Sequence, residues 1–89
     1  MLVLPAELTH AQATAALRML LQGLRAQSGD VVVDATALAR FDSSALAVLL
    51  ECRRASFGLG RTFAVRGLPT RLAALAGLYG VAELLPSAA

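Results

Sequence analysis

The spacing of apolar residues along the chain predicts three helices. The first lies within residues 9–30, where apolar side chains recur every three to four positions after Thr9, a predicted N-cap. The second runs from about Ser43 to Phe57, and the third follows Pro69, a residue favoured in the first turn of a helix. The apolar positions that define the three helices are Ala13, Leu17, Leu20, Leu21 and Leu24, then Leu46, Leu49, Leu50 and Phe57, and finally Leu72, Leu75, Leu78 and Tyr79.

Three short segments that alternate with these helices predict the strands. Residues 1–4 and 31–35 are apolar runs, and residues 61–67 show the alternation of side chains that is typical of a strand. The central run, VVVDA, has no polar alternation, which is typical of a strand covered on both faces. Strands and helices alternate with short connections, which predicts an α/β fold with a mostly parallel sheet. In the C-terminal tail, Leu84 and Leu85 are expected to pack on the domain.

The size and composition of the chain indicate one domain with much apolar surface. The 89 residues suffice for a single core, so we predict one domain, 1–89. Apolar residues make up 57% of the sequence and charged residues 16%, so part of the surface is expected to lie against a partner. No apolar run reaches the roughly 18 residues of a membrane helix, and residues 1–8 do not resemble an export signal. We therefore predict a cytoplasmic protein that does not insert into the membrane.

The charged residues give little support to nucleic-acid binding. The formal net charge is +2, and the eight basic residues, all of them arginine, are scattered along the chain. Nucleic-acid-binding domains carry a basic stripe or an aromatic platform instead.

Residues that could carry chemistry are few. The only histidine, His10, and the only cysteine, Cys52, lie 42 positions apart, whereas metal ligands cluster. We interpret His10 as solvated at a helix start and Cys52 as a small buried side chain. Asp34, Asp42 and Ser43 could form a hydrolase site, yet the connections are too short to build a pocket. The sequence favours a protein without catalytic activity, metal or cofactor.

The stretch FDSSAL, residues 41–46, allows two interpretations. In one, Asp42 or Ser43 only caps the second helix by accepting a free backbone N–H. In the other, a hydroxyl in the first helical turn is also a switch. A phosphate added there would bring a charge of about −1.5 to −2 onto a surface that a partner covers. One residue can serve both purposes, and both interpretations stay open at this point.

The sequence VVVDATALARFDSSALAVLLECRRA, residues 31–55, resembles the signature stretch of STAS domains. In that family a hydrophobic strand ending in Asp precedes a loop and a D-[ST]-[STG]-G-[LI] motif that opens a helix. LPAELT resembles the family's strand with its GELD segment, and GRTFAVRGLPTRLAALAGLYGVAELLP resembles its last strand and helix. The closing LYGVAELLP is most similar to the MlaB type of STAS domain. The resemblance covers almost the whole chain and implies a STAS fold, a small mostly parallel or mixed sheet with helices packed mainly on one face.

The resemblance also implies a function, because STAS domains are non-catalytic interaction modules. MlaB-type members bind the cytoplasmic ATPase of an ABC transporter that moves phospholipids and maintains outer-membrane lipid asymmetry. Such a partner would hold the chain at the inner-membrane face. The alternative is an anti-sigma-factor antagonist, which binds an anti-sigma factor that is also a serine kinase. That kinase phosphorylates the hydroxyl residue after the motif Asp, a position that Ser43 occupies here.

The resemblance and the helical pattern together predict a partner surface at the start of the second helix. Ser43 takes the position that lies at the ATPase contact in MlaB-type proteins. The helix is apolar around most of its circumference, so we expect the sheet to cover one side and a partner another. The predicted partner-binding residues are Arg40, Asp42, Ser43, Ser44, Ala47, Glu51 and Arg54. For Glu51 and Arg54 the alternative is a solvated i, i+3 ion pair.

Two departures from the STAS pattern affect these expectations. The Gly that follows the motif hydroxyls is Ala45 here, which demands ordinary helical angles. STAS domains also have another strand before the GELD-like segment, whereas this sequence begins at Met1, close to that segment. A missing strand would leave a sheet edge unpaired. A partner or a second copy in a homodimer would then cover that edge, unless the start of the chain lies further upstream.

Overall fold

Two parallel ladders of strands form the β-structure in the computed structural model, which describes residues 1–88. The main sheet has the order β1-β3-β5, from β1 (Leu2–Val3), β3 (Val31–Asp34) and β5 (Phe63–Arg66). A second ladder pairs β2 (Glu7–Leu8) with β4 (Arg40–Phe41). The apolar pattern does not predict β2 and β4, because two-residue strands carry no periodicity. Every pairing between these strands is parallel, so the predicted parallel sheet is confirmed.

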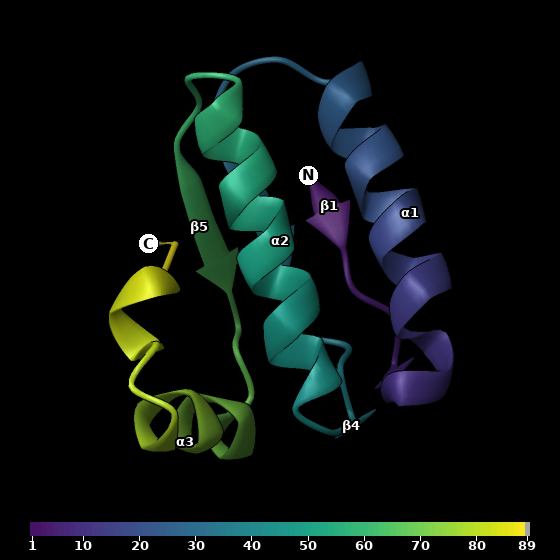
Figure 1. Ribbon diagram of the computed structural model, residues 1–89, viewed down its shortest axis with the longest axis vertical. Coiled ribbons are helices and arrows are strands. Elements are labelled where there is room, and N and C mark those ends of the chain that lie inside the picture. The colour runs from purple at the N-terminus through teal and green to yellow at the C-terminus, as the bar shows by residue number, and fades with distance from the viewer. Residues whose placement is uncertain (89) are drawn as a thin grey trace.

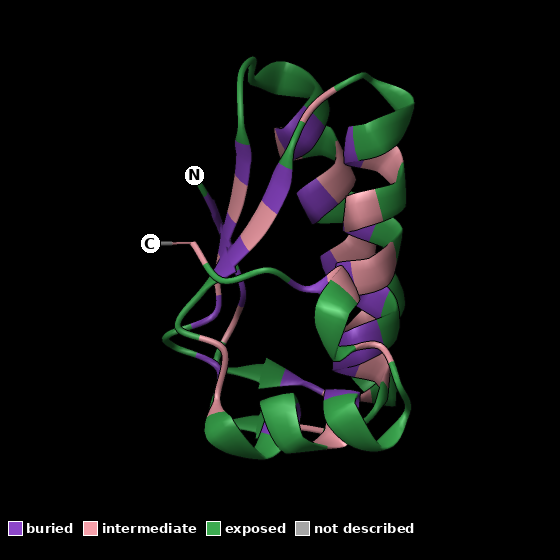
Figure 2. Ribbon diagram, turned by 90° about the vertical axis from the view of Figure 1, so that its left-hand side faces the viewer, coloured by how far each residue is buried: buried purple, intermediate pink, exposed green. Residues whose placement is uncertain are grey.

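Helices connect the strands and lie mainly on one face of the main sheet. α1 (His10–Ala26) and α2 (Ser44–Gly58) pack side by side over the same face (Figure 1, Figure 2). α3 (Thr70–Leu78) crosses the end of the molecule at which α2 begins, and the short 3-10 turn η1 (Ala82–Leu84) follows it (Figure 1). None of the helices within residues 1–88 is both long and apolar enough to cross a membrane. The predicted α/β arrangement, with helices mainly on one face, is confirmed.

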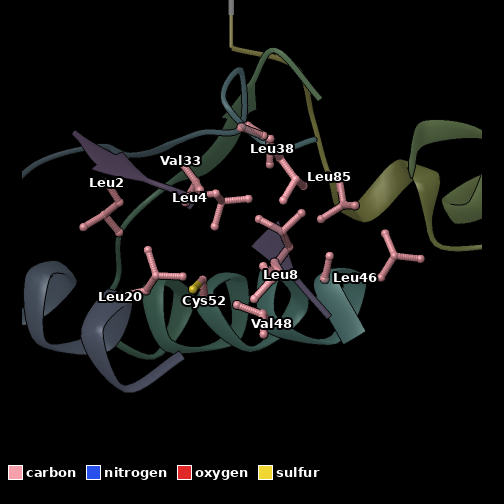
Figure 3. Close-up of a cluster of buried hydrophobic side chains, with 14 of the residues drawn as sticks. Leu2, Leu4, Leu8, Leu20, Val33, Leu38, Leu46, Val48, Cys52 and Leu85 are labelled. Atoms are coloured by element: carbon pink, nitrogen blue, oxygen red, sulfur yellow. The ribbon is translucent and has the colours of Figure 1, made fainter. Parts of the chain in front are cut away.

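The hydrophobic core lies between the main sheet and the layer of α1 and α2 (Figure 3). Leu2, Val33 and Val65 stand in register on the three strands, and all three are buried. Cys52 lies among these apolar side chains, as expected for a small buried residue. The buried residues that α1 and α2 contribute are Ala16, Leu20 and Leu24 from α1 and Ala45, Leu46, Val48, Leu49, Cys52 and Ser56 from α2.

The other face of the main sheet is only partly covered, which corrects the expectation for the VVVDA run. Val31 and Val33 are buried against the helices, whereas Val32 and Asp34 alternate to the opposite face and stay partly exposed. Val3 on β1 is 55% exposed. The cause is that α1 and α2 share one side of the sheet. Within residues 1–88 β1 pairs only with β3, so the covering of its outer edge by a partner or a second copy stays a prediction.

Three residues of the predicted apolar stripes are exposed. Phe57 at the end of α2 is 51% exposed, and Leu78 and Tyr79 at the end of α3 are 80% and 58% exposed. Membership of an apolar stripe therefore does not place these three side chains in the core. Helical spacing identifies the side of a helix on which residues lie, but not how far its neighbours extend along it. In α3 the buried side chains are Leu72 and Ala76 instead.

The C-terminal tail packs against β5. The N–H of Val65 donates to the carbonyl of Pro86 at 2.8 Å, and the N–H of Ala88 donates to the carbonyl of Val65 at 2.8 Å. Leu85 is buried and Leu84 is partly buried, so the expected packing of the tail is confirmed.

Candidate functional site

Asp42 joins the starts of α1 and α2. One oxygen of its carboxylate accepts the backbone N–H of His10 at 3.0 Å, and the other accepts the N–H of Ser44 at 2.8 Å. These bonds, first the one from His10 and then the one from Ser44, hold the pKa of Asp42 below its ordinary value, because they stabilise the ionised form. Of the two candidate caps in the sequence, Asp42 is the one that satisfies free helix N–H groups.

Ser43 is exposed, and its side chain takes no part in capping. Its backbone already has helical angles, φ −62° and ψ −16°, and its side chain makes no capping hydrogen bond. Its carbonyl accepts the N–H groups of Leu46 at 3.1 Å and Ala47 at 3.3 Å. Because α2 begins without help from this hydroxyl, the hydroxyl stays available to a partner or to a modifying enzyme.

A line of exposed residues runs along α2 from Ser43. Ala47, Glu51 and Arg54 follow at intervals of three or four positions, so the four residues share one side of the helix, and all are exposed. Glu51 and Arg54 form an ion pair of 3.6 Å, with side chains that are 50% and 82% exposed. The i, i+3 ion pair, one of the two alternatives for these residues, is thus present. A partner that binds Glu51 or Arg54 has to contact the ion pair or break it.

A shallow groove of about 220 Å³ separates this line from α1. α1 therefore covers part of α2 in addition to the sheet, and the covering of the exposed side of α2 by a partner stays a prediction. A partner is left with the exposed line and the mouth of the groove. The residues that line the groove are Ser44, Ala47, Val48 and Glu51 from α2 and His10, Ala13, Thr14 and Leu17 from α1.

The partner-binding residues predicted from the sequence include none from α1, which forms the second wall of the groove. The apolar pattern assigns His10 to solvent and Leu17 to the core, and it gives Thr14 no role. One signal is present in the sequence, since these three residues follow each other at intervals of four and three positions. Such a line, which mixes polar and apolar side chains, is typical of the boundary between the buried and exposed sides of a helix.

Arg40 is not part of α2. It belongs to β4, and its guanidinium forms a 3.7 Å ion pair with Glu7 on the neighbouring strand β2. Glu7 also accepts a hydrogen bond of 2.6 Å from the side-chain amide of Gln12, whose carbonyl oxygen accepts the N–H of Thr9 at 2.8 Å. Arg40 therefore belongs to a polar network around the first turn of α1.

The remaining residues that the sequence singles out serve local structure. Ala45 is fully buried, and no residue other than glycine within residues 1–88 has a positive φ, so α2 begins with ordinary helical angles. Asp34 accepts the hydroxyl of Thr36 at 2.7 Å and its N–H at 2.9 Å, and these bonds lower the pKa of its carboxyl. Burial, with a smaller effect from Glu51, raises the pKa of the Cys52 thiol to about 11. Within the described residues, no three potential metal ligands come together.

Comparison with known proteins identifies one family. A protein-family model described as "Mlab, STAS domain" matches residues 1–86. The matched residues include every helix and strand described above and both sides of the groove. A search of curated proteins found no match.

Proposed function

Because the chain belongs to the STAS domain family of the MlaB type, we propose that it is a non-catalytic accessory subunit that binds the cytoplasmic ATPase of a phospholipid-transporting ABC system. In this proposal the chain acts in the cytoplasm and reaches the inner-membrane face only through the ATPase. It supports the assembly and activity of a transporter that maintains outer-membrane lipid asymmetry.

The observation that carries the proposal is the exposed, uncommitted hydroxyl of Ser43 at the head of the line on α2. Ala47, in the middle of the line, has a small side chain, so a partner's backbone can approach the helix closely there. Ser43 and Ser44 before it and Glu51 after it supply hydrogen-bonding groups, the arrangement expected of an apolar contact with a polar rim. Asp42 contributes indirectly, because it holds the first turn of α2.

A negative charge at Ser43 should weaken the binding of the partner without affecting the folding of the chain. The free N–H groups at the start of a helix favour anions, so a charge at this exposed position is compatible with the helix. The same charge would have to be desolvated, or to find a cation, when a partner covers the surface. Ser43→Glu is therefore expected to fold normally and to lose the partner, whereas Ser43→Ala removes only the hydroxyl.

The test is an affinity pull-down from the native host, read by mass spectrometry and followed by binding measurements with the purified partner. We expect wild type to recover an ABC ATPase, Ser43→Ala to bind it more weakly, and Ser43→Glu to lose it. Ser28→Glu is the matched control, because Ser28 is exposed in the loop at the opposite end of the molecule. Failure of wild type to bind any ABC ATPase, in cells or as purified components, would contradict the proposal.

The accessibility of Ser43 also favours a second function, that of an anti-sigma-factor antagonist controlled by phosphorylation. A kinase can reach a hydroxyl that is exposed and free of capping bonds. In that case the pull-down recovers a serine kinase or a sigma-factor regulator, and the kinase with ATP adds one phosphate to wild type and none to Ser43→Ala. An unchanged intact mass of wild type after this treatment would exclude the second function.

A further inference from the structure

Arg71 of α3 is stacked on a ring next to the motif at the start of α2. Its guanidinium carbon lies 5.1 Å from the centre of the ring of Phe41, the residue before Asp42. The stack joins two elements that are 30 positions apart in sequence. Arg71 is exposed, and no carboxylate within residues 1–88 forms an ion pair with it. Its guanidinium therefore lies over the ring, and its charge has no ion-pair partner among residues 1–88.

The stacking leaves the hydrogen-bonding capacity of Arg71 intact. A guanidinium is planar, and its N–H donors point outward in that plane, so a ring against one face does not occupy them. Two parallel N–H donors match the two oxygens of a carboxylate. Because the ring restricts the side chain, less conformational entropy is lost when a carboxylate binds.

Leu78 extends this feature along α3. It lies seven positions after Arg71, almost two full helical turns, so the two residues share one side of the helix. Its side chain is 80% exposed, and that of the next residue, Tyr79, is 58% exposed, so two neighbouring large apolar side chains at this end of α3 are open to a partner. Between Arg71 and Leu78 lies Ala74, which is exposed and has a small side chain, so the helix surface between these two residues is low.

We propose that the partner surface continues from Ser43 across the Phe41–Arg71 stack to Leu78, and that it receives a segment of the partner protein that carries an Asp or Glu and a large apolar side chain. The carboxylate binds the free edge of Arg71, and the apolar side chain packs on Leu78. The inference rests on the proposed function in taking the ABC ATPase as the partner, and it adds α3 to a surface otherwise confined to α2. Arg71, which lies over the ring of Phe41 and has no ion-pair partner among residues 1–88, is the expected centre of the binding energy, as arginine often is in protein interfaces.

The first test compares matched variants in binding to the purified ATPase. We expect Arg71→Ala to raise the Kd at least about tenfold and Leu78→Ala to raise it about three- to tenfold. Two controls repeat the chemistry at the other end of α2. Arg53 is stacked on Phe57 with 4.4 Å to the ring centre, and Leu59 is 55% exposed, so Arg53→Ala and Leu59→Ala should leave the Kd unchanged. Thermal unfolding of each variant verifies that it is folded.

The second test identifies the carboxylate. The chain has no lysine, so Arg71→Lys introduces the only side-chain amine. A zero-length carbodiimide joins an amine to a carboxylate in contact with it, and mass spectrometry locates the link. We expect a covalent link from position 71 to an Asp or Glu of the ATPase, and no such link from the matched variant Arg53→Lys.

The outcomes distinguish this inference from the proposed function. If wild type binds the ATPase and the Arg71 and Leu78 variants bind it equally well, the extension to α3 is wrong and the proposed function stands. If the Arg71 and Leu78 variants weaken binding but the complex of Arg71→Lys gives no covalent link, the proposal that Arg71 binds a carboxylate of the ATPase is wrong. If wild type does not bind the ATPase at all, the proposed function fails first.

Discussion

The backbone N–H of His10 donates a hydrogen bond of 3.0 Å to the carboxylate of Asp42, which lies 32 positions later in the chain. The same carboxylate accepts the N–H of Ser44, so one side chain holds the first turns of both helices that border the groove. The residue before Ser43 thus fixes α2 relative to α1. A partner that binds at Ser43 therefore contacts a surface whose geometry depends on the two hydrogen bonds of Asp42.

The first prediction concerns acid stability. The pKa of Asp42 is lowered in the fold by the hydrogen bonds from His10 and Ser44, so the folded state binds the proton of this group less readily than the unfolded chain does. The stabilisation from Asp42 is therefore fully present above the ordinary aspartate pKa of about 4 and is lost as pH falls through the lowered folded value. Urea unfolding between pH 7 and pH 2.5 measures it.

The variant Asp42→Asn supplies the comparison. It keeps one oxygen acceptor but has no proton to gain, so the fall in the free energy of unfolding below pH 4 should be smaller than in wild type. Asp34, whose pKa is also lowered, retains its own contribution in both proteins. Equal acid sensitivity of wild type and Asp42→Asn would show that the two bonds do not favour the ionised carboxylate.

The local part of this arrangement could be predicted from sequence, and the long-range part could not. A short acidic residue before an apolar helical pattern predicts a cap, and α2 begins within one residue of the predicted Ser43. The bond from His10 to Asp42 depends on how two helices pack, and nothing within a few residues of either one encodes it. The same holds for the β2–β4 ladder, whose two-residue strands show no alternation.

The candidate site also has one part that the sequence predicts and one part that depends on how the helices pack. Helical spacing alone places Ser43, Ala47, Glu51 and Arg54 on one side of α2, and the structure shows them exposed there. The groove needs α1 as its second wall, so a pattern read along one helix could not predict it. Spacing also places Leu78 in the apolar stripe of α3, but it does not show where the packed layer ends, and Leu78 is 80% exposed.

The second prediction compares a buried and an exposed leucine. Leu49 is 0% exposed in the layer between α2 and the sheet, so Leu49→Ala should lower the free energy of unfolding by about 2–5 kcal/mol through lost burial and a residual cavity. Leu78→Ala, the same substitution at a side chain that is 80% exposed, should change it by less than about 0.5 kcal/mol. Urea unfolding of the two variants checks both values. Similar losses at the two sites would mean that α3 packs more tightly than described.

The third prediction concerns the thiol of Cys52. The side chain is 0% exposed and its pKa is raised to about 11, so at pH 8 almost none of it is the reactive thiolate. Native protein should react with a disulfide reagent orders of magnitude more slowly than protein in urea. Leu49→Ala should speed the native reaction, because destabilisation raises the population of open states. Fast labelling of folded wild type would place the thiol at the surface instead.

The fourth prediction concerns Gly67, which follows β5 and has a φ of +66°. A Cβ atom added at this position would lie 2.1 Å from Cγ2 of Thr36. Gly67→Ala adds both an unfavourable backbone conformation and a steric overlap, so it should cost more than about 1 kcal/mol in the free energy of unfolding. Gly77→Ala is the control, because its Cβ meets nothing within 4 Å in the helical α3, and it should stabilise by about 0.5–1 kcal/mol. Thr36→Ser removes the overlapping methyl but keeps the hydroxyl that bonds Asp34, so it should recover part of the loss in Gly67→Ala. The loss of unfolding free energy that remains in the double variant measures the backbone strain together with the remaining contacts of 3.2 and 3.3 Å to Thr36. Full recovery of the wild-type free energy would mean that the positive φ has no cost.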